Sequence, residues 1–153
     1  MLIDNFLIIY LITARLIELR ISKKNTQKLL DRGAKEFFPF HYKFIVLFHF
    51  FFIVYFFIKS FYVQVIDFNI LFVFFLIQIL RYKIISDLGE YWTTRIIVLE
   101  KEPMSKKGIY KYLKHPNYIV VFIEIFLICL IFYDYPGLLF FSFINLVLIS
   151  IRI

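Results

Sequence analysis

Five long apolar runs constrain the fold of this chain more than any other feature of its sequence. They cover about residues 2–19, 42–62, 65–85, 116–133 and 135–153. An α-helix rises about 1.5 Å per residue, so roughly 20 apolar residues cross the ~30 Å hydrocarbon layer of a bilayer. Hydrophobic residues make up 62% of the 153 residues, above the ~45–50% of typical soluble domains. The sequence therefore predicts an all-α integral membrane protein with about five transmembrane helices, as a single domain over residues 1–153.

The basic residues indicate how these helices are oriented. All of the 18 lysines and arginines except Lys59 fall at one side of the predicted bundle, mainly in residues 20–43 and 81–114. The other side carries Asp4, Asp67 and Asp134. The positive-inside rule then predicts a multi-pass protein with its N-terminus outside and its C-terminus in the cytosol. The net charge of +7 reflects this topology and anionic lipid, so it does not indicate a nucleic-acid partner.

Residues 86–115 form the longest segment outside the apolar runs and contain the only tryptophan, Trp92. Connections of this length are usually functional or disordered. Disorder is not expected, because Trp92 and the apolar residues 96–99 can anchor the segment at the membrane. We expect a cytosolic re-entrant or interfacial loop before the fourth helix, with a short helix or strand lying on the membrane.

Lys114, His115 and Pro116 mark the start of the fourth helix as a candidate anion site. Proline suits the first helical position because its missing N–H costs nothing there. Free backbone amides at residues 117–119, the cation of Lys114 and the ring of His115 are suited to a carboxylate or phosphate. The alternative is that His115 only caps the helix that Pro116 begins. For tyrosines and lysines near helix ends, interfacial anchoring is a further alternative.

Glu124 lies about two turns into the fourth helix, where an ionisable group within a bilayer suggests a functional role. The alternative is a structural hydrogen bond to a neighbouring helix, for instance to Asn145 or His49. Glu18, near the inner end of the first helix, can pair with Arg15 three residues earlier.

The motifs of several other chemistries are missing. The chain has no Gly-x-Gly-x-x-Gly and no P-loop lysine motif, so it offers neither a Rossmann dinucleotide site nor a nucleotide-hydrolysing loop. Its three histidines lie far apart without metal-ligand spacing, so we expect no metal.

Residues 108–118, GIYKYLKHPNY, resemble the Gly-x-Tyr-x-x-x-Arg-His-Pro-x-Tyr signature of the isoprenylcysteine carboxyl methyltransferases. Residues 88–108, LGEYWTTRIIVLEKEPMSKKG, are similar to the cytosolic segment that precedes this signature in the bacterial branch of the family. Residues 15–37 are similar to the first cytosolic loop of that branch. The resemblance covers nearly the whole chain, and related phospholipid methyltransferases share the His-Pro core.

The resemblance implies a membrane-embedded enzyme that uses S-adenosylmethionine to methylate the carboxylate of a lipidic or prenylated substrate at the cytosolic face. It places Tyr110, Lys114, His115, Pro116 and Tyr118 at the cofactor, with Trp92 shaping the pocket wall. Catalytic candidates are Arg95, which would orient an anionic substrate, and Glu124, which with Glu18 would meet the amine of the cofactor. The substrate would enter sideways between the helices, through their phenylalanine-rich faces.

Two departures from the family pattern bear on activity. Lys114 stands where the family has arginine, which keeps the charge but loses the planar two-pronged donor. Family members also continue beyond the last helix into a cytosolic tail with a pair of glutamates near the cofactor. This sequence ends at Ile153, so we expect either a truncated and inactive copy or a site closed in another way.

Two rival functions stay open. One is methylation of a phospholipid amine or of a lipidic hydroxyl such as that of a polyketide. A hydroxyl would need a base, and His115 or a glutamate could supply it. The other is a non-enzymatic membrane scaffold, which would not bind S-adenosylmethionine at all.

Overall fold

The computed structural model of the protein describes residues 2–63, 67–100 and 108–151. Within these residues the chain forms five α-helices, which are α1 (Leu2–Asp31), α2 (Pro39–Lys59), α3 (Phe68–Leu88), α4 (Pro116–Ile131) and α5 (Tyr135–Ser150). Two 3-10 helices, η1 (Gly89–Tyr91) and η2 (Gly108–Lys111), and two strands, β1 (Lys35–Phe37) and β2 (Ile96–Val98), lie between them. The prediction of five helices is confirmed, and α4 starts at Pro116 as expected.

Two of the described helices are long and apolar enough to cross a membrane. They are α2 and the continuous stretch Phe68–Tyr91, each with a mean hydropathy of 1.8. Helices α4 and α5 are also apolar but have only 16 residues each. At about 1.5 Å per residue these two span roughly 24 Å, somewhat less than the hydrocarbon layer.

Helix α1 is longer than predicted, with 30 residues. Residues 20–31, which we expected to lie in a loop, contain no glycine or proline, so nothing in them stops the helix. Gly33 ends it with φ +88, and the amides of Gly33 and Ala34 donate to the carbonyls of Leu30 and Leu29. This is the Schellman pattern, which needs the left-handed conformation that glycine adopts freely. The first basic segment is therefore mainly helix.

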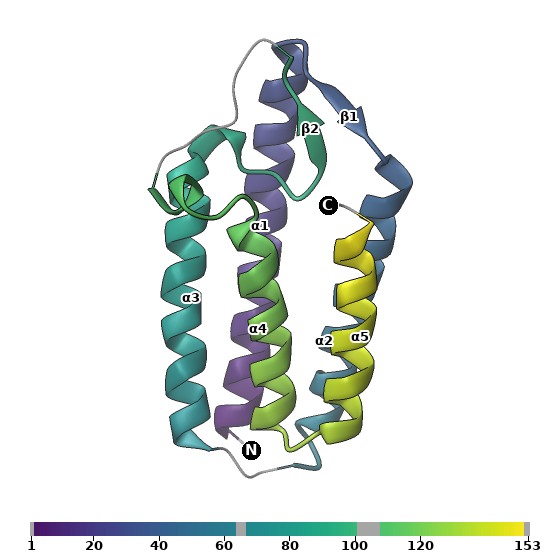
Figure 1. Ribbon diagram of the computed structural model, residues 1–153. Helices are drawn as coiled ribbons and strands as arrows, with labels where there is room; N and C mark the ends of the chain where they lie inside the picture. Colours follow the sequence, from purple (N-terminus) through teal and green to yellow (C-terminus); the bar gives the residue numbers. More distant parts are fainter. Residues whose placement is uncertain (1, 64–66, 101–107, 152–153) are drawn as a thin grey trace.

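Beside the helices of the predicted all-α fold, β1 and β2 form a small antiparallel sheet. Lys35 pairs with Val98 and Phe37 with Ile96. A strand in residues 86–115 was one of the expected possibilities, but its partner in the first basic segment was not foreseen. The pairing joins the two basic segments at one end of the bundle, beside the upper part of α1 and above α4 and α5 in Figure 1.

The five helices run side by side, and α1 begins at the opposite end of the bundle from the end of α5 (Figure 1). Phenylalanines fill the core between α2, α4 and α5. Phe52 meets Phe141 edge to face, with ring centroids 5.0 Å apart and an angle of 90° between the rings. Contacts of this kind contribute about 0.5–1.5 kcal/mol beyond the burial of the rings. The buried Phe56 packs against both Phe132 and Phe141.

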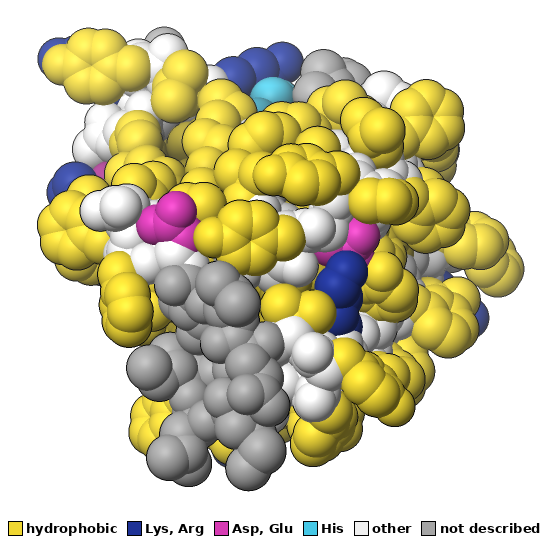
Figure 2. Space-filling model, turned by 90° about the horizontal axis from the view of Figure 1, so that it is seen from below, with side chains coloured by type: hydrophobic (Ala, Val, Ile, Leu, Met, Phe, Trp, Pro, Cys, Tyr) yellow, Lys and Arg dark blue, Asp and Glu magenta, His cyan; other side chains and the backbone are white. Residues whose placement is uncertain are grey.

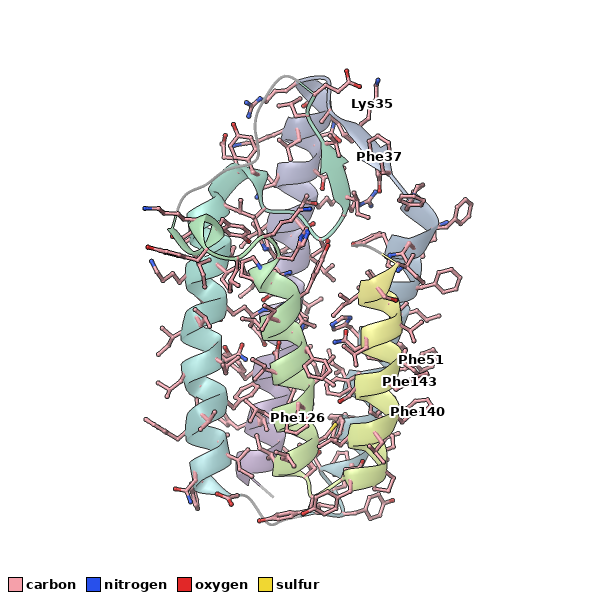
Figure 3. All side chains as sticks on the ribbon, in the orientation of Figure 1. Lys35, Phe37, Phe51, Phe126, Phe140 and Phe143 are labelled. Carbon is pink, nitrogen blue, oxygen red and sulfur yellow. The ribbon has the colours of Figure 1, made fainter. Side chains whose placement is uncertain are left out.

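Other phenylalanines point away from the bundle. Phe51, Phe140 and Phe143 extend outward from α2 and α5 (Figure 3), and Phe143 is 68% exposed. Seen from the end that holds the N-terminus, hydrophobic side chains dominate the described surface and charged ones are few (Figure 2). Exposed apolar surface of this extent is what lipid contact requires and what soluble monomers avoid.

The end opposite the sheet has one well-connected charge, Asp134 at the start of α5. Its carboxylate accepts a hydrogen bond from Tyr55 at 2.6 Å and one from the amide of Gly137 at 2.9 Å, and it pairs with Lys59 at 2.8 Å. Burial alone would raise the pKa of Asp134, but these donors outweigh burial and lower it. Lys59, the one basic residue predicted on this side of the bundle, therefore forms an ion pair with an aspartate predicted on the same side.

Candidate functional site

A cavity of about 910 Å³ lies under the sheet and continues between the helices. Its polar end is lined by residues of the 91–99 and 110–118 segments, at the upper end of the bundle in Figure 1. Its apolar end is lined by side chains of α1, α2 and α5, among them Ile12, Ile45, Phe50, Ile53 and Leu148. The volume is near the top of the roughly 300–1,000 Å³ range of small-molecule sites. One space therefore joins a polar mouth to the apolar faces of the helices.

The extension of α1 holds the polar end in place. Asn25 donates to the carbonyl of Gly89 at 3.0 Å and to that of Trp92 at 2.8 Å. Ser22 exchanges a hydrogen bond with Thr94 at 2.7 Å and also accepts from the Thr94 amide at 2.9 Å. The first basic segment, predicted to be a loop, is thus a helix that holds residues 89–94 of the second segment. Trp92, only 2% exposed, is packed on this support and lines the cavity.

Gly108 and Asp87 explain the first part of the Gly-x-Tyr motif. Gly108 has φ +53, and a Cβ built there would lie 1.9 Å from Oδ2 of Asp87. The same carboxylate accepts the amide of Ile109 at 3.1 Å, which fixes the start of η2. Tyr110 is thereby placed on the cavity wall. Its pKa is raised by burial first and then by the charge of Asp87, so the hydroxyl stays protonated and can donate a hydrogen bond.

The start of α4 lies at the cavity. Lys114, His115, Pro116 and Tyr118 all line it. The rings of His115 and Tyr118 are stacked, with centroids 5.2 Å apart and planes 11° from parallel. His115 occupies the cap position, but its side chain makes no capping hydrogen bond.

One detail of the predicted anion site is wrong. The amide of Tyr118 donates to the His115 carbonyl at 3.2 Å, so it is not one of the free groups at this helix start.

Arg95 also lines the cavity, and its charge is already matched. Its Nη1 donates to both carboxylate oxygens of Glu36, a residue of β1, at 3.1 Å. Its guanidinium lies over the Tyr42 ring, 4.6 Å from the centroid, in a cation–π contact. An anionic substrate would therefore have to compete with Glu36 for this side chain.

Glu124 belongs to a buried cluster of four charges drawn from three helices. Arg15 donates to Glu18 and to Glu124, both at 2.5 Å. Arg81 donates to Oε2 of Glu18 and to Glu124, both at 2.8 Å, and makes a further short bond to Oε1 of Glu18. Two guanidiniums and two carboxylates balance to zero net charge. Arg81, which the sequence placed near the cytosolic end of the third helix, is only 4% exposed.

This cluster corrects the partners suggested for Glu124. The sequence pointed to Asn145 or His49, and the structure pairs Glu124 with Arg15 and Arg81 instead. The predicted pair of Arg15 with Glu18 is confirmed. Glu124 is not among the residues that line the large cavity, although its partners Arg15 and Arg81 are. Its effect on a bound ligand would therefore pass through these arginines.

Two further polar residues on the cavity wall, His49 and Asn145, received no site role from the sequence. The sequence does mark each of them, because each is a polar residue within an apolar run. It does not show that the two residues line the same cavity. Among residues 2–63, 67–100 and 108–151, no three or more His, Cys, Asp or Glu side chains gather as metal ligands would.

Two comparisons with known proteins found matches to this chain. The model of the isoprenylcysteine carboxyl methyltransferase (ICMT) family matches residues 69–153, which include the whole of the GIYKYLKHPNY segment. A protein of Bacillus subtilis (strain 168), whose name is printed as uncharacterized protein YpbQ, is 38% identical over 156 residues. That alignment covers 96% of this chain and 90% of the relative. No solved structure matches the chain. The matches support a membrane methyltransferase.

Proposed function

This chain belongs to the isoprenylcysteine carboxyl methyltransferase family, and on that premise we propose that it transfers a methyl group from S-adenosylmethionine to an oxygen of a lipidic acceptor at the cytosolic face of a membrane. The observation that carries this proposal is the single cavity, which contacts both the signature residues and the apolar faces of the helices. A soluble cofactor reaches the protein from water, whereas a lipid tail reaches it from the bilayer. The cavity offers a polar lining to the first and an apolar lining to the second.

The polar end of the cavity has the donors and acceptors that S-adenosylmethionine needs. The indole N–H of Trp92 and the amide oxygen of Asn117 are buried, and neither has a hydrogen-bond partner among the described residues. Buried polar atoms without partners are costly, at about 1–3 kcal/mol each, and are rare in native proteins unless a ligand or water satisfies them. One donor and one acceptor, from two residues that line the same cavity, suit a nucleoside that carries both kinds of group.

Lys114 supplies the charge for the cofactor's carboxylate. It is exposed, lines the cavity, and is the one cationic residue among the described lining residues for which the structure shows no ion pair. The start of α4 adds the positive end of a helix dipole beside it. The stacked rings of His115 and Tyr118 offer a flat face nearby. We assign these residues, with Tyr110, to cofactor binding.

When bound, S-adenosylmethionine supplies an electrophilic methyl group on a positively charged sulfur. The protein's contribution is to hold the acceptor oxygen against that methyl and to exclude water. Positioning of this kind is worth up to about 7–11 kcal/mol. The carboxylate named by the family would need no base, and Arg95 would orient it if Glu36 releases the guanidinium. The cluster that contains Glu124 would hold Arg15 and Arg81 in place on the cavity wall.

The same proposal fixes the arrangement in the membrane. We propose that all five helices cross the bilayer and that residues 1–153 act as one domain, with the N-terminus outside. The sheet, η2 and the start of α4 then lie at the cytosolic surface. A lipid tail would enter from the side, through the apolar part of the cavity between α1, α2 and α5.

Calorimetry on detergent-purified protein tests the cofactor site directly. We expect S-adenosylmethionine and S-adenosylhomocysteine to bind the wild-type protein and His115→Ala to abolish binding. Tyr112→Ala is the matched control, because Tyr112 lies in the same segment but is 80% exposed and does not line the cavity. Unchanged binding by His115→Ala would remove His115 from the site, and no binding by the wild type would favour the non-enzymatic scaffold.

A further inference from the structure

Two polar side chains face the otherwise apolar part of the cavity, His49 on α2 and Asn145 on α5. Nδ1 of His49 lies 2.9 Å from the carbonyl oxygen of Ile45. A carbonyl only accepts, so in the neutral ring the proton is on Nδ1 and the lone pair is on Nε2. Among the described residues the structure shows no hydrogen bond to Nε2. The ring therefore presents an acceptor to whatever occupies the cavity.

Asn145 presents the complementary group. Its side chain is 3% exposed, and its amide nitrogen has no hydrogen-bond partner among the described residues. A buried amide left in this state is destabilising, and a native site retains such a group when a ligand completes it. The amide can donate to an oxygen that at the same time donates to His49.

The packing of α2 against α5 brings the two residues to a similar depth. Phe48 and Phe52 both contact the ring of Phe141, with centroids 6.1 and 5.0 Å away. Asn145 follows Phe141 by four residues, so it lies one helical turn further along the same face of α5. His49 follows Phe48 directly on α2. The helices run in opposite directions, so this turn of α5 lies beside the part of α2 that holds Ile45 and His49.

The charges around this position exclude a carboxylate as the natural occupant. Arg15 and Arg81 line the cavity but are paired with Glu18 and Glu124. Arg95 is paired with Glu36. Lys114, the remaining described cation of the lining, is assigned to the cofactor. A carboxylate in the apolar part would lack a counter-charge, which is costly in such surroundings, whereas a neutral hydroxyl needs one acceptor and one donor.

We propose that His49 and Asn145 bind a hydroxyl group of the lipidic acceptor, and that His49 takes the proton of this hydroxyl during methyl transfer. This inference rests on the proposed function and narrows its acceptor to a lipid alcohol, phenol or enol. The hydroxyl oxygen forms the new bond to the methyl carbon as the methyl–sulfur bond breaks, and the sulfur keeps that electron pair. The proton passes to Nε2 of His49 and from there to solvent.

A binding experiment tests the hydroxyl site without the cofactor. Three amphiphiles with the same tail serve as probes: para-dodecylphenol, its methyl ether and para-dodecylbenzoate. We expect the phenol to raise the melting temperature of the detergent-purified protein more than either analogue, because only the phenol both donates and accepts here. Asn145→Leu, which is similar in size, should weaken phenol binding about tenfold, because the phenol oxygen loses its donor. Equal stabilisation by phenol and ether, or undiminished phenol binding in Asn145→Leu, would overturn the site.

Turnover tests the role of His49. With S-adenosylmethionine and para-dodecylphenol, His49→Gln should lower kcat by roughly 10²–10⁴-fold, the usual contribution of a general base, with KM changed only a few-fold. A difluorinated phenol, which ionises without help, should restore most of the lost rate, and a purely structural defect would not be rescued in this way. His41→Gln is the matched control, a histidine on the same helix that does not line the cavity. An unchanged kcat in His49→Gln, or a loss that the acidic phenol does not restore, would refute the proton transfer.

Different results would refute the hydroxyl site and the proposed methyltransferase function. Methylation of para-dodecylbenzoate but not of the phenol would refute this inference while supporting the proposed function. Absence of S-adenosylmethionine binding together with phenol binding that Asn145→Leu weakens would refute the proposed function and leave the hydroxyl site standing.

Discussion

Glutamine in place of Glu124 would leave two guanidiniums and one carboxylate in the buried cluster. Glu124 is 2% exposed, and its Oε2 accepts from Arg15 at 2.5 Å and from Arg81 at 2.8 Å. The substitution keeps the volume of the side chain but removes the charge that both bonds depend on. The amide oxygen could still accept both bonds, since both arginines donate to one oxygen of Glu124, but it would carry no charge. One positive charge is then buried without compensation.

The cost follows from the burial of the pair. Removing one partner of a buried ion pair destabilises proteins by about 3–5 kcal/mol. For a chain of this size, ~1 kcal/mol shifts the melting temperature by roughly 2–4 °C. We therefore expect Glu124→Gln to melt about 6–20 °C below the wild type. Adding Arg15→Gln restores neutrality, with Arg81 and Glu18 still paired, so the double variant should be more stable than Glu124→Gln alone.

Thermal unfolding of detergent-purified variants, followed by circular dichroism, measures these shifts. Glu100→Gln is the control, because the same substitution there breaks the exposed pair of Glu100 and Lys35. Exposed pairs contribute at most about 1 kcal/mol, so this control should melt within a few degrees of the wild type. Equal melting temperatures for Glu124→Gln and Glu100→Gln would show that the cluster is not the buried, mutually dependent network described above.

Two further predictions concern the loops. Gly108→Ala should lower S-adenosylmethionine affinity at least tenfold in calorimetry, because the new Cβ would displace Asp87 and with it η2. Gly33→Ala is the control, since Gly33 also has a positive φ but no atom lies within 4 Å of the added Cβ, and it should keep the affinity. Equal effects of the two substitutions would contradict the argument. Asp134 has a lowered pKa, so its ion pair with Lys59 adds stability that is complete above the pKa of an unfolded aspartate, about 3.9, and is lost as the pH falls through the folded value. The melting temperature of the wild type should fall more steeply below that pH than that of Asp134→Asn, and parallel curves would argue against the pair.

Much of the fold could be predicted because it depends on neighbouring residues. The apolar runs gave the five helices, and proline at position 116 gave the start of α4. The length of α1 could have been read from its lack of glycine and proline before Gly33, but the dense lysines suggested a loop. The signature residues were placed at one site by resemblance, and the structure brings them to one cavity without testing their roles.

The sequence alone determined which segments are helices, which end of the bundle is basic, and which short segment carries the methyltransferase signature, since hydropathy, charge and helix starts are local properties. The tertiary structure alone decided which side chains meet. Arg81 reaches Glu18 across 63 residues and Glu124 across 43, and the β1–β2 sheet joins two loops in the same way. His49 and Asn145 face one cavity only because α2 and α5 pack through their phenylalanines. Such meetings depend on how whole helices pack, and no local pattern of residues encodes that.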